Sequence, residues 1–209
     1  MCSHGHNGGC GDEVANVVGA FEGSVYAMNA FIDTSRVTVL NETIDGSGVK
    51  VFKSWDRKCS REEFVESDVD EELLFNIPFT AHVKLTGILF VGDMDGTHPS
   101  RLKIFKDRPS MSFADAETAI PDQEMAIKQD SVGEIDYPLK VSKFSNVSCI
   151  SLYFPSNFGA DQTRLYYIGL RGEYQCDFRQ AVTIANYEAR PMADDHKAEH
   201  REQVFKDVC

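Results

Sequence analysis

The sequence predicts an all-β protein with the strand arrangement of a jelly-roll sandwich. About ten short segments of alternating or β-branched residues are separated by turn residues roughly every 8 to 15 positions. No amphipathic helical pattern longer than about two turns interrupts them. The long connections at residues 54–74 and 107–123 favour a jelly roll over a series of simple hairpins. A chain of 209 residues with 42% hydrophobic residues suits one domain with a substantial core.

In chain order, the first strands are expected at residues 37–42, a β-branched run, and at 49–53, where apolar residues alternate with lysine. Residues 73–77 and 82–91 are expected to form two strands that pair or pack side by side. Pro78 lies between them and has no backbone N–H to donate. It must therefore occupy a strand end, a bulge or an edge.

The second half of the chain continues the pattern. We predict a strand with one wet face at 101–106, one helical turn at 112–117 that ends before Pro121, and short strands at 123–129 and 137–141. Residues 149–154 and 165–170 are strongly β, and the loop at 157–163 between them has the length of a hairpin connection. Gly172 is expected to end that run, and residues 181–185 to form a last strand.

The two ends of the chain differ from the middle in composition. Residues 1–16 are rich in Gly, His and Asn, and residues 189–209 carry mixed charge without periodicity, so we expect flexible tails around a domain at 17–188. The first tail holds Cys2, His4, His6 and Cys10, which are potential zinc or copper ligands. We favour a tail without metal, because structural zinc sites place separated ligand pairs on ordered turns.

Charge and cysteine content exclude several classes of protein. The net charge of −12 argues against nucleic-acid partners and against an anionic membrane surface, both of which need a basic footprint. No apolar run approaches the roughly 18 residues of a membrane-spanning helix, and the N-terminus lacks the apolar region of a signal peptide. We therefore expect a cytoplasmic protein whose six cysteines are free thiols.

No catalytic motif is present in the sequence. It contains no Gly-rich phosphate loop, no Cys-x-x-Cys, no His-Glu-x-x-His and no Gly-x-Ser-x-Gly. Cys149 falls inside a strand pattern, where a buried and unreactive thiol is expected. The sequence thus predicts a protein that is not an enzyme and that needs no cofactor.

The acidic stretch at residues 66–72 is the candidate binding segment. We predict that it forms a surface turn whose carboxylates face a partner: Glu66, Asp68, Asp70, Glu71 and Glu72. A calcium loop is the alternative, but such loops use glycine to bend the backbone, and none occurs between Gly48 and Gly87. Two structural roles also remain open. Ser67 with Asp70 and Glu71 could cap a helical turn, and Ser67 and Asp68 could hold backbone donors where the next strand begins.

This acidic stretch and the motifs around it resemble the PITH domain family. The likeness covers roughly residues 17–188, and the matching pieces occur in order: Leu40-Asn41-Glu42; Trp55; the acidic stretch with Leu73-Leu74; Ile77-Pro78-Phe79-Thr80; Val83-Lys84-Leu85; residues 99–105; Met111-Ser112-Phe113; Lys143-Phe144 with Asn146-Val147; Asn157-Phe158-Gly159 with Thr163; and residues 167–173.

The resemblance implies a galactose-binding-like jelly roll without catalytic activity that associates with the 26S proteasome, through its regulatory particle, as a monomer. Animal members of the family are also linked to transcriptional control of blood-cell differentiation, which implies a nuclear as well as a cytoplasmic location. The chain has no thioredoxin domain of the kind fused to some members, so redox activity is not carried over.

A different class of function is a small-ligand or carbohydrate-binding sandwich. A sugar-binding site of this kind would need aromatic rings on the loops, and Trp55 and Phe158 are the candidates in this sequence. Trp55 lies in a charged context, so it could equally be a core anchor or an exposed contact for a partner.

Overall fold

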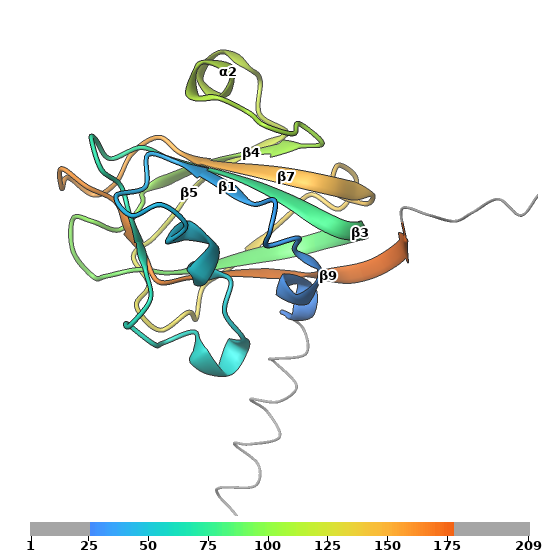
Figure 1. Cartoon of the computed structure of the whole chain (residues 1–209), viewed down its shortest axis with the longest axis horizontal. Coiled ribbons are helices and arrows are strands. Elements are labelled where there is room, and N and C mark those ends of the chain that lie inside the picture. Colours follow the sequence, from blue (N-terminus) through green and yellow to red (C-terminus); the bar gives the residue numbers. More distant parts are fainter. Residues whose placement is uncertain (1–25, 178–209) are drawn as a thin grey trace, which may run out of the picture. The chain divides into compact units, whose positions relative to one another are not determined.

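The computed structural model describes residues 26–177, which form strands joined by loops and short helical turns (Figure 1). The predicted tails at 1–16 and 189–209, with Cys2, His4, His6 and Cys10, and the predicted strand at 181–185 lie outside the described residues. The elements in chain order are η1 (Ala27–Phe31), β1 (Thr38–Leu40), η2 (Gly48–Val51), η3 (Trp55–Arg57), β2 (Val65–Glu66), β3 (Leu73–Val91), β4 (Arg101–Lys106), α2 (Phe113–Thr118), β5 (Gln123–Ala126), β6 (Asp136–Pro138), β7 (Val147–Phe154), β8 (Arg164–Leu165) and β9 (Tyr167–Asp177).

The fold is organised around β3, a strand of 19 residues. Its first part pairs with β1 and β7, and its last part pairs with β9 and β6. The register with β7 shifts between Pro78 and Val83. The prediction of two adjacent strands at 73–77 and 82–91 was therefore wrong, because one strand continues through the irregularity and changes partners there. Of the strand end, bulge or edge expected for Pro78, the structure shows an irregularity, since the shift in register begins at this residue.

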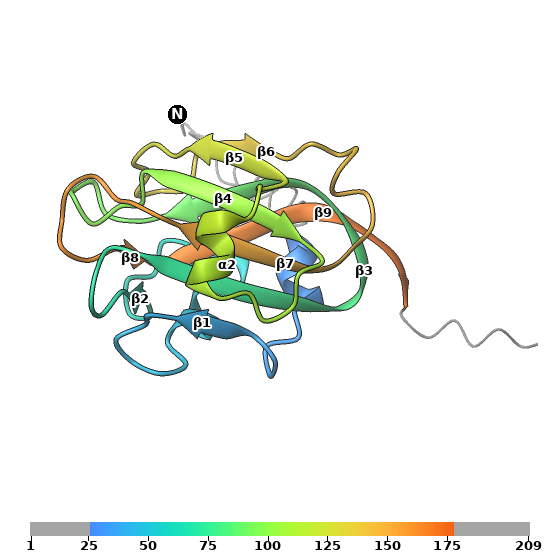
Figure 2. The ribbon, with the colours of Figure 1, turned by 90° about the horizontal axis from the view of Figure 1, so that it is seen from above.

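Because the first and last parts of β3 pair with different strands, β3 joins two antiparallel layers. One layer has the order β1-β3-β7-β4-β5, and the other consists of the last part of β3 with β9 and β6. Figures 1 and 2 show the strands of the two layers one above the other. The short strands β2 and β8 form a separate pair. The predicted all-β jelly-roll sandwich is confirmed.

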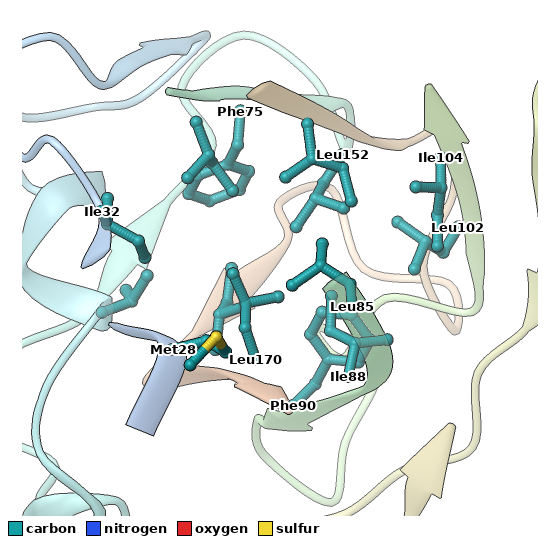
Figure 3. Packing of buried hydrophobic residues seen from close by; sticks show 14 of the residues in the cluster. Met28, Ile32, Phe75, Leu85, Ile88, Phe90, Leu102, Ile104, Leu152 and Leu170 are labelled. Carbon is teal, nitrogen blue, oxygen red and sulfur yellow. The ribbon is translucent and has the colours of Figure 1, made fainter. Parts of the chain in front are cut away.

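The main core fills the space between the layers, as Figure 3 shows. Phe75, Leu152 and Ile104 point inward from one layer toward Phe90 and Leu170 from the other, and all five are almost fully buried. Alternate residues along β7 enter this core, as the period of two along a strand requires. Burial of this apolar surface is the principal force that stabilises the sandwich.

A second cluster lies on the outer face of the first layer, where α2 covers part of the sheet. It comprises Leu74, Phe105, Met111, Ala116 and Tyr153. The helical turn predicted at 112–117 is confirmed as α2, which begins with a capping box. The backbone N–H of Asp115 donates to Ser112 Oγ, and the backbone N–H of Ser112 donates to the Asp115 carboxylate.

Three other local predictions were wrong. Residues 49–53 form no strand, because the Glu42 carboxylate accepts the backbone N–H groups of Gly46 and Gly48 and bends the segment into η2. The loop at 157–163 is not a hairpin, because β8 pairs with β2 and β9 with β3. Strand β9 also continues through Gly172, where a Cβ would overlap the carbonyl oxygen of Lys84.

Candidate protein-interaction site

Four loops lie together at one end of the sandwich, at the left of Figure 2, and we call them the loop end: residues 41–47, 67–72, 92–98 and 155–163. Hydrogen bonds tie each loop to another. The Asp68 N–H donates to Asn41 O at 3.0 Å, Gln162 Nε2 donates to Asp68 O at 3.4 Å, and the Phe158 N–H donates to Gly96 O at 3.1 Å. The loop end is therefore one connected surface.

The loop end combines exposed apolar side chains with carboxylates. Each loop exposes one large apolar residue: Ile44 is 63% exposed, Val69 83%, Met94 63% and Phe158 46%. The same loops carry no lysine or arginine, and their acids are Glu42, Asp45, Asp68, Asp70, Glu71, Glu72, Asp93, Asp95 and Asp161. Apolar tips surrounded by charge of one sign are typical of a surface that binds a protein of opposite charge.

The acidic stretch is shaped by Asn41, which has a left-handed backbone with φ of 67°. Its Nδ2 donates to Asp70 Oδ1 and to the carbonyl oxygen of Glu72, each at 2.7 Å, and its Oδ1 accepts the Val69 N–H at 3.1 Å. Asparagine tolerates this backbone region better than most residues. The turn is thus held from β1, about 28 residues earlier in the chain.

The structure divides the five predicted carboxylates into two groups. Glu66 accepts Arg164 Nε at 3.0 Å, Glu72 accepts the Tyr153 hydroxyl at 2.8 Å, and Asp70 accepts the Glu72 N–H at 3.0 Å. Within residues 26–177, the side-chain oxygens of Asp68 and Glu71 have no hydrogen-bond partner. These two, with Val69 between them, are the part of the turn open to a partner.

Both structural alternatives for this stretch need correction. Residues 67–72 form bends rather than a helical turn, so Ser67, Asp70 and Glu71 cap no helix. The carboxylate that holds a backbone donor at the start of β3 is Asp70, not Asp68. Ser67 is instead buried, and its Oγ accepts the Thr163 N–H at 2.8 Å, which fixes the turn to the loop before β8.

The environment of Glu72 differs from that of its neighbours. Burial raises the pKa of Glu72, and the nearby carboxylates of Asp70 and Glu71 raise it further, against the opposing effect of the Tyr153 hydroxyl. Among residues 26–177, no three His, Cys, Asp or Glu side chains gather in the way that a metal ion would require. In the same part of the chain, no helix is long and apolar enough to cross a membrane.

A cluster of cations and aromatic rings stands behind the acidic turn. Arg164 binds Glu66 and lies 5.2 Å from the Phe64 ring, while Arg61 binds Asp93 at 2.9 Å and lies 4.2 Å from the Tyr166 ring. Sequence reasoning missed this cluster, because its members come from segments about 100 residues apart. The only available signal was the interleaving of arginine with aromatic residues at 57–64 and 164–167.

The two aromatic candidates for a sugar site are not equivalent. Trp55 is half-buried, its ring stacks on Tyr26 at a centroid distance of 4.7 Å, and Lys58 Nζ lies 3.8 Å from its centroid. It packs with the buried cluster that includes Leu89, so the core-anchor interpretation is the one the structure supports. Phe158 remains exposed at the loop end, next to the His98 ring.

The cysteines within the described residues are free: Cys59, Cys149 and Cys176. Cys149 is 9% exposed, and burial raises the pKa of its thiol, with the charge of Asp107 acting in the same direction. A protonated, buried thiol is a poor nucleophile. The predicted unreactive Cys149 agrees with this environment.

Comparison with known proteins agrees with the resemblance that the motifs carry. The model of the PITH domain matches residues 20–191. The chain is 51% identical over 206 residues to PITH domain-containing protein ZK353.9 of Caenorhabditis elegans, with 99% of each chain covered. It is 47% identical over 199 residues to PITH domain-containing protein 1 of Homo sapiens, which covers 93% of this chain and 94% of the human protein.

Two solved structures align with the sandwich. CBM32-3 from a family 31 glycoside hydrolase of Clostridium perfringens gives a TM-score of 0.45 at 12% identity, over 70% of this chain and 98% of that one. The C-terminal domain of a chitobiase from Bacteroides fragilis gives 0.45 at 14% identity, over 69% and 99%. The assignment of a family rests on the sequence relatives, which match this chain almost from end to end at about half identity, and by that measure the chain belongs to the PITH domain family.

Proposed function

We propose that this chain is a non-enzymatic protein-interaction module that associates with the 26S proteasome through its regulatory particle, and that the loop end is the contact surface. The observation that carries the proposal is the set of exposed apolar side chains held among carboxylates on hydrogen-bonded loops. Membership of the PITH domain family supports the partner. A role in both cytoplasm and nucleus, including transcriptional regulation, belongs to the same proposal.

The two kinds of side chain would contribute differently to binding. Burying an exposed side chain such as Val69 contributes roughly 25 cal/mol for each Å² of apolar surface removed from water. The carboxylates of Asp68 and Glu71 would attract a basic partner over distance and mainly raise the association rate. Because Asp68 is exposed, Glu71 is only partly buried and neither carboxylate has a hydrogen-bond partner within residues 26–177, their contribution to folding should stay within about 1 kcal/mol.

The test uses the full-length chain, purified 26S proteasome and two loop-end variants, Val69→Ser and the double variant Asp68→Asn/Glu71→Gln. We expect both variants to bind at least about fivefold more weakly, and the double variant to lose much of the salt dependence that the wild type shows. Matched controls are Ile120→Ser, at an apolar residue 86% exposed in the loop before β5, and Glu124→Gln/Glu173→Gln at exposed residues of β5 and β9.

The affinity of each variant for immobilised 26S proteasome should be measured at several salt concentrations. Thermal unfolding should be recorded on the same samples. The melting temperatures of all variants should stay close to that of the wild type, because none of the changed side chains supports the fold. Equal binding by the loop-end and control variants would place the contact elsewhere. Failure of the wild-type chain to bind proteasome at low salt would contradict the proposed partner.

A further inference from the structure

A pocket of about 320 Å³ lies on the outer face of the first layer, beside the part of the sheet that α2 covers. The register places Thr38, Asn76 and Ser151 in one cross-strand row on neighbouring strands β1, β3 and β7. The adjacent row, Leu74 and Tyr153, belongs to the apolar cluster under α2. The outer face therefore changes from an apolar row under α2 to a polar row that lines the pocket, in which Asn76 and Ser151 are buried and Thr38 is exposed.

The pocket is positively charged in a chain whose net charge is −12. Arg36 and Arg108 line it, and none of the lining residues is an aspartate or a glutamate. Hydroxyl groups come from Thr38, Ser110, Ser148 and Ser151. The thiol of Cys149 also lines the pocket, and since burial raises its pKa it adds no negative charge at neutral pH.

Both arginines retain donors for a ligand. Arg108 makes no ion pair within residues 26–177, and its only side-chain hydrogen bond there is a long one of 3.4 Å from Nη2 to the carbonyl oxygen of Ile120. Arg36 is paired with Asp33 at 3.6 Å, but its side chain is 70% exposed, so water screens that pair. A guanidinium group has five N–H donors, and each of these two has most of them free.

The segment that presents Arg108 is held in an unusual backbone conformation. Asp107 has φ of 52° and Ser110 has φ of 57°, both in the left-handed region. The Asp107 carboxylate accepts hydrogen bonds from the Ser148 N–H at 2.8 Å and from Ser148 Oγ at 2.6 Å, and these bonds hold the segment against β7. Left-handed non-glycine residues are uncommon, and they concentrate where a site needs a fixed geometry.

We propose that this pocket binds a small phosphorylated ligand, with its phosphate group contacting Arg36 and Arg108. The planar guanidinium group matches the geometry of phosphate oxygens, and charge-assisted hydrogen bonds of this type are the strong ones. A phosphate monoester carries up to two negative charges and three terminal oxygens, enough for two arginines and for the hydroxyls of Thr38 and Ser110. The volume is at the lower end of the range for small-molecule sites and suits a molecule the size of a sugar phosphate.

The test is an NMR titration of the full-length ¹⁵N-labelled chain at constant ionic strength with inorganic phosphate, glucose 6-phosphate, glucose and citrate. We expect saturable shifts at residues 36–38, 108–110 and 148–149 with phosphate and with glucose 6-phosphate, tighter for the sugar phosphate, and none with glucose. Arg36→Gln and Arg108→Gln should each weaken binding at least about tenfold, which corresponds to about 1.4 kcal/mol.

Three further variants make the outcome specific. Ser110→Gly is compatible with the left-handed backbone and removes the hydroxymethyl side chain, so it should weaken binding by a smaller factor of about two to five. Arg101→Gln is the control, because this arginine is on β4, 60% exposed and paired with Glu124 away from the pocket, and it should leave the affinity unchanged. If Arg108→Gln disturbs the packing on Phe105, the exposed Arg36 still provides the test through Arg36→Gln and its charge-preserving partner Arg36→Lys.

Four results would overturn the proposal. The first is a set of shifts that do not saturate below about 20 mM phosphate, and the second is a loss of affinity in Arg101→Gln as large as in the pocket variants. The third is unchanged affinity in Arg36→Gln, and the fourth is binding of citrate without binding of phosphate. The last would assign the pocket to carboxylates instead.

Discussion

At the scale of single residues, the acidic turn depends on Asn41. One side chain donates to a carboxylate and a carbonyl oxygen and accepts a backbone N–H, while its own backbone adopts a left-handed conformation. Of the carboxylates, Asp70 helps to hold the turn by accepting hydrogen bonds from Asn41 and from the Glu72 N–H. Asp68 and Glu71 are displayed on the frame that Asn41, directly after β1, builds with Asp70.

We predict that Asn41→Ala lowers the free energy of unfolding by about 2 to 3 kcal/mol, because it removes these hydrogen bonds and places a Cβ residue at positive φ without compensation. Asn41→Gly removes the same bonds but tolerates the backbone, so it should be about 1 kcal/mol less destabilising than Asn41→Ala. Urea denaturation measures both. As a control, Asn146→Ala at an exposed residue should change the free energy of unfolding by less than about 0.5 kcal/mol. A loss in this control as large as in Asn41→Ala would contradict the role of Asn41 in holding the turn.

At the scale of elements, β3 and β9 form the longest pairing, and it includes a register shift between Leu85 and Gly87. At this irregularity the backbone of Gly172 lies directly against the carbonyl group of Lys84. A Cβ at this position meets backbone rather than a flexible side chain, so nothing nearby can move aside cheaply. The close approach of the two strands therefore requires glycine.

Gly172→Ala should consequently lower the free energy of unfolding by about 3 kcal/mol or more, since relief of the overlap requires separation of two strands that carry core residues on both sides. Differential scanning calorimetry measures the loss. The neighbouring Glu173→Ala removes only an exposed ion pair with Lys84 and should cost at most about 1 kcal/mol. Similar values for the two variants would show that β9 can shift to accept the methyl group.

At the scale of the whole molecule, two buried polar groups link the stability of the fold to pH. His98 is fully buried; burial lowers its pKa, because the site holds the neutral ring, with Nδ1 near Pro99 O and Nε2 accepting the Asp130 N–H. The Asp130 carboxylate accepts four backbone N–H groups at residues 132–135. Burial alone would raise the pKa of Asp130, but these bonds outweigh it and lower the pKa.

Both shifts make the unfolded chain bind more protons than the folded chain in acid, so stability falls as pH falls. The contribution of His98 should decline from about pH 6.5 downward, and that of Asp130 from about pH 4 downward. The pKa of Glu72, which burial raises, opposes this trend in part.

We therefore predict a two-stage loss of unfolding free energy between pH 7 and pH 3, measured by urea denaturation. Asp130→Asn should be destabilised at pH 7 and should lose part of the second stage, because the lowered pKa of Asp107 contributes to the same stage. Long-range ¹H–¹⁵N spectra of the imidazole across the same pH range should show that His98 gains its proton at a lower pH than a histidine of the unfolded chain, because burial lowers its pKa. A stability profile of Asp130→Asn parallel to that of the wild type across this range would contradict the assignment.

The sequence by itself determined the class of fold and most of its local detail. Alternation along 101–106 and 149–154 predicted strands, the breakers between them predicted loops, and the segment at 112–117 predicted the helical turn that is α2. The motifs from Leu40 to Glu173 also specified the family. These features are local, because a period of two or a capping box is complete within a few residues.

The tertiary structure decided which segments meet. The residues near Pro78 do not predict that β3 continues past it and pairs with new strands. Residues 66–72 do not predict that Asn41 holds the turn or that Arg164 forms an ion pair with Glu66. The arginine-lined pocket likewise joins segments from β1, β3, β7 and the loop after β4. Such contacts link residues up to about 100 positions apart, and their formation depends on strand pairing that satisfies backbone hydrogen bonds across the whole domain, which no local pattern encodes.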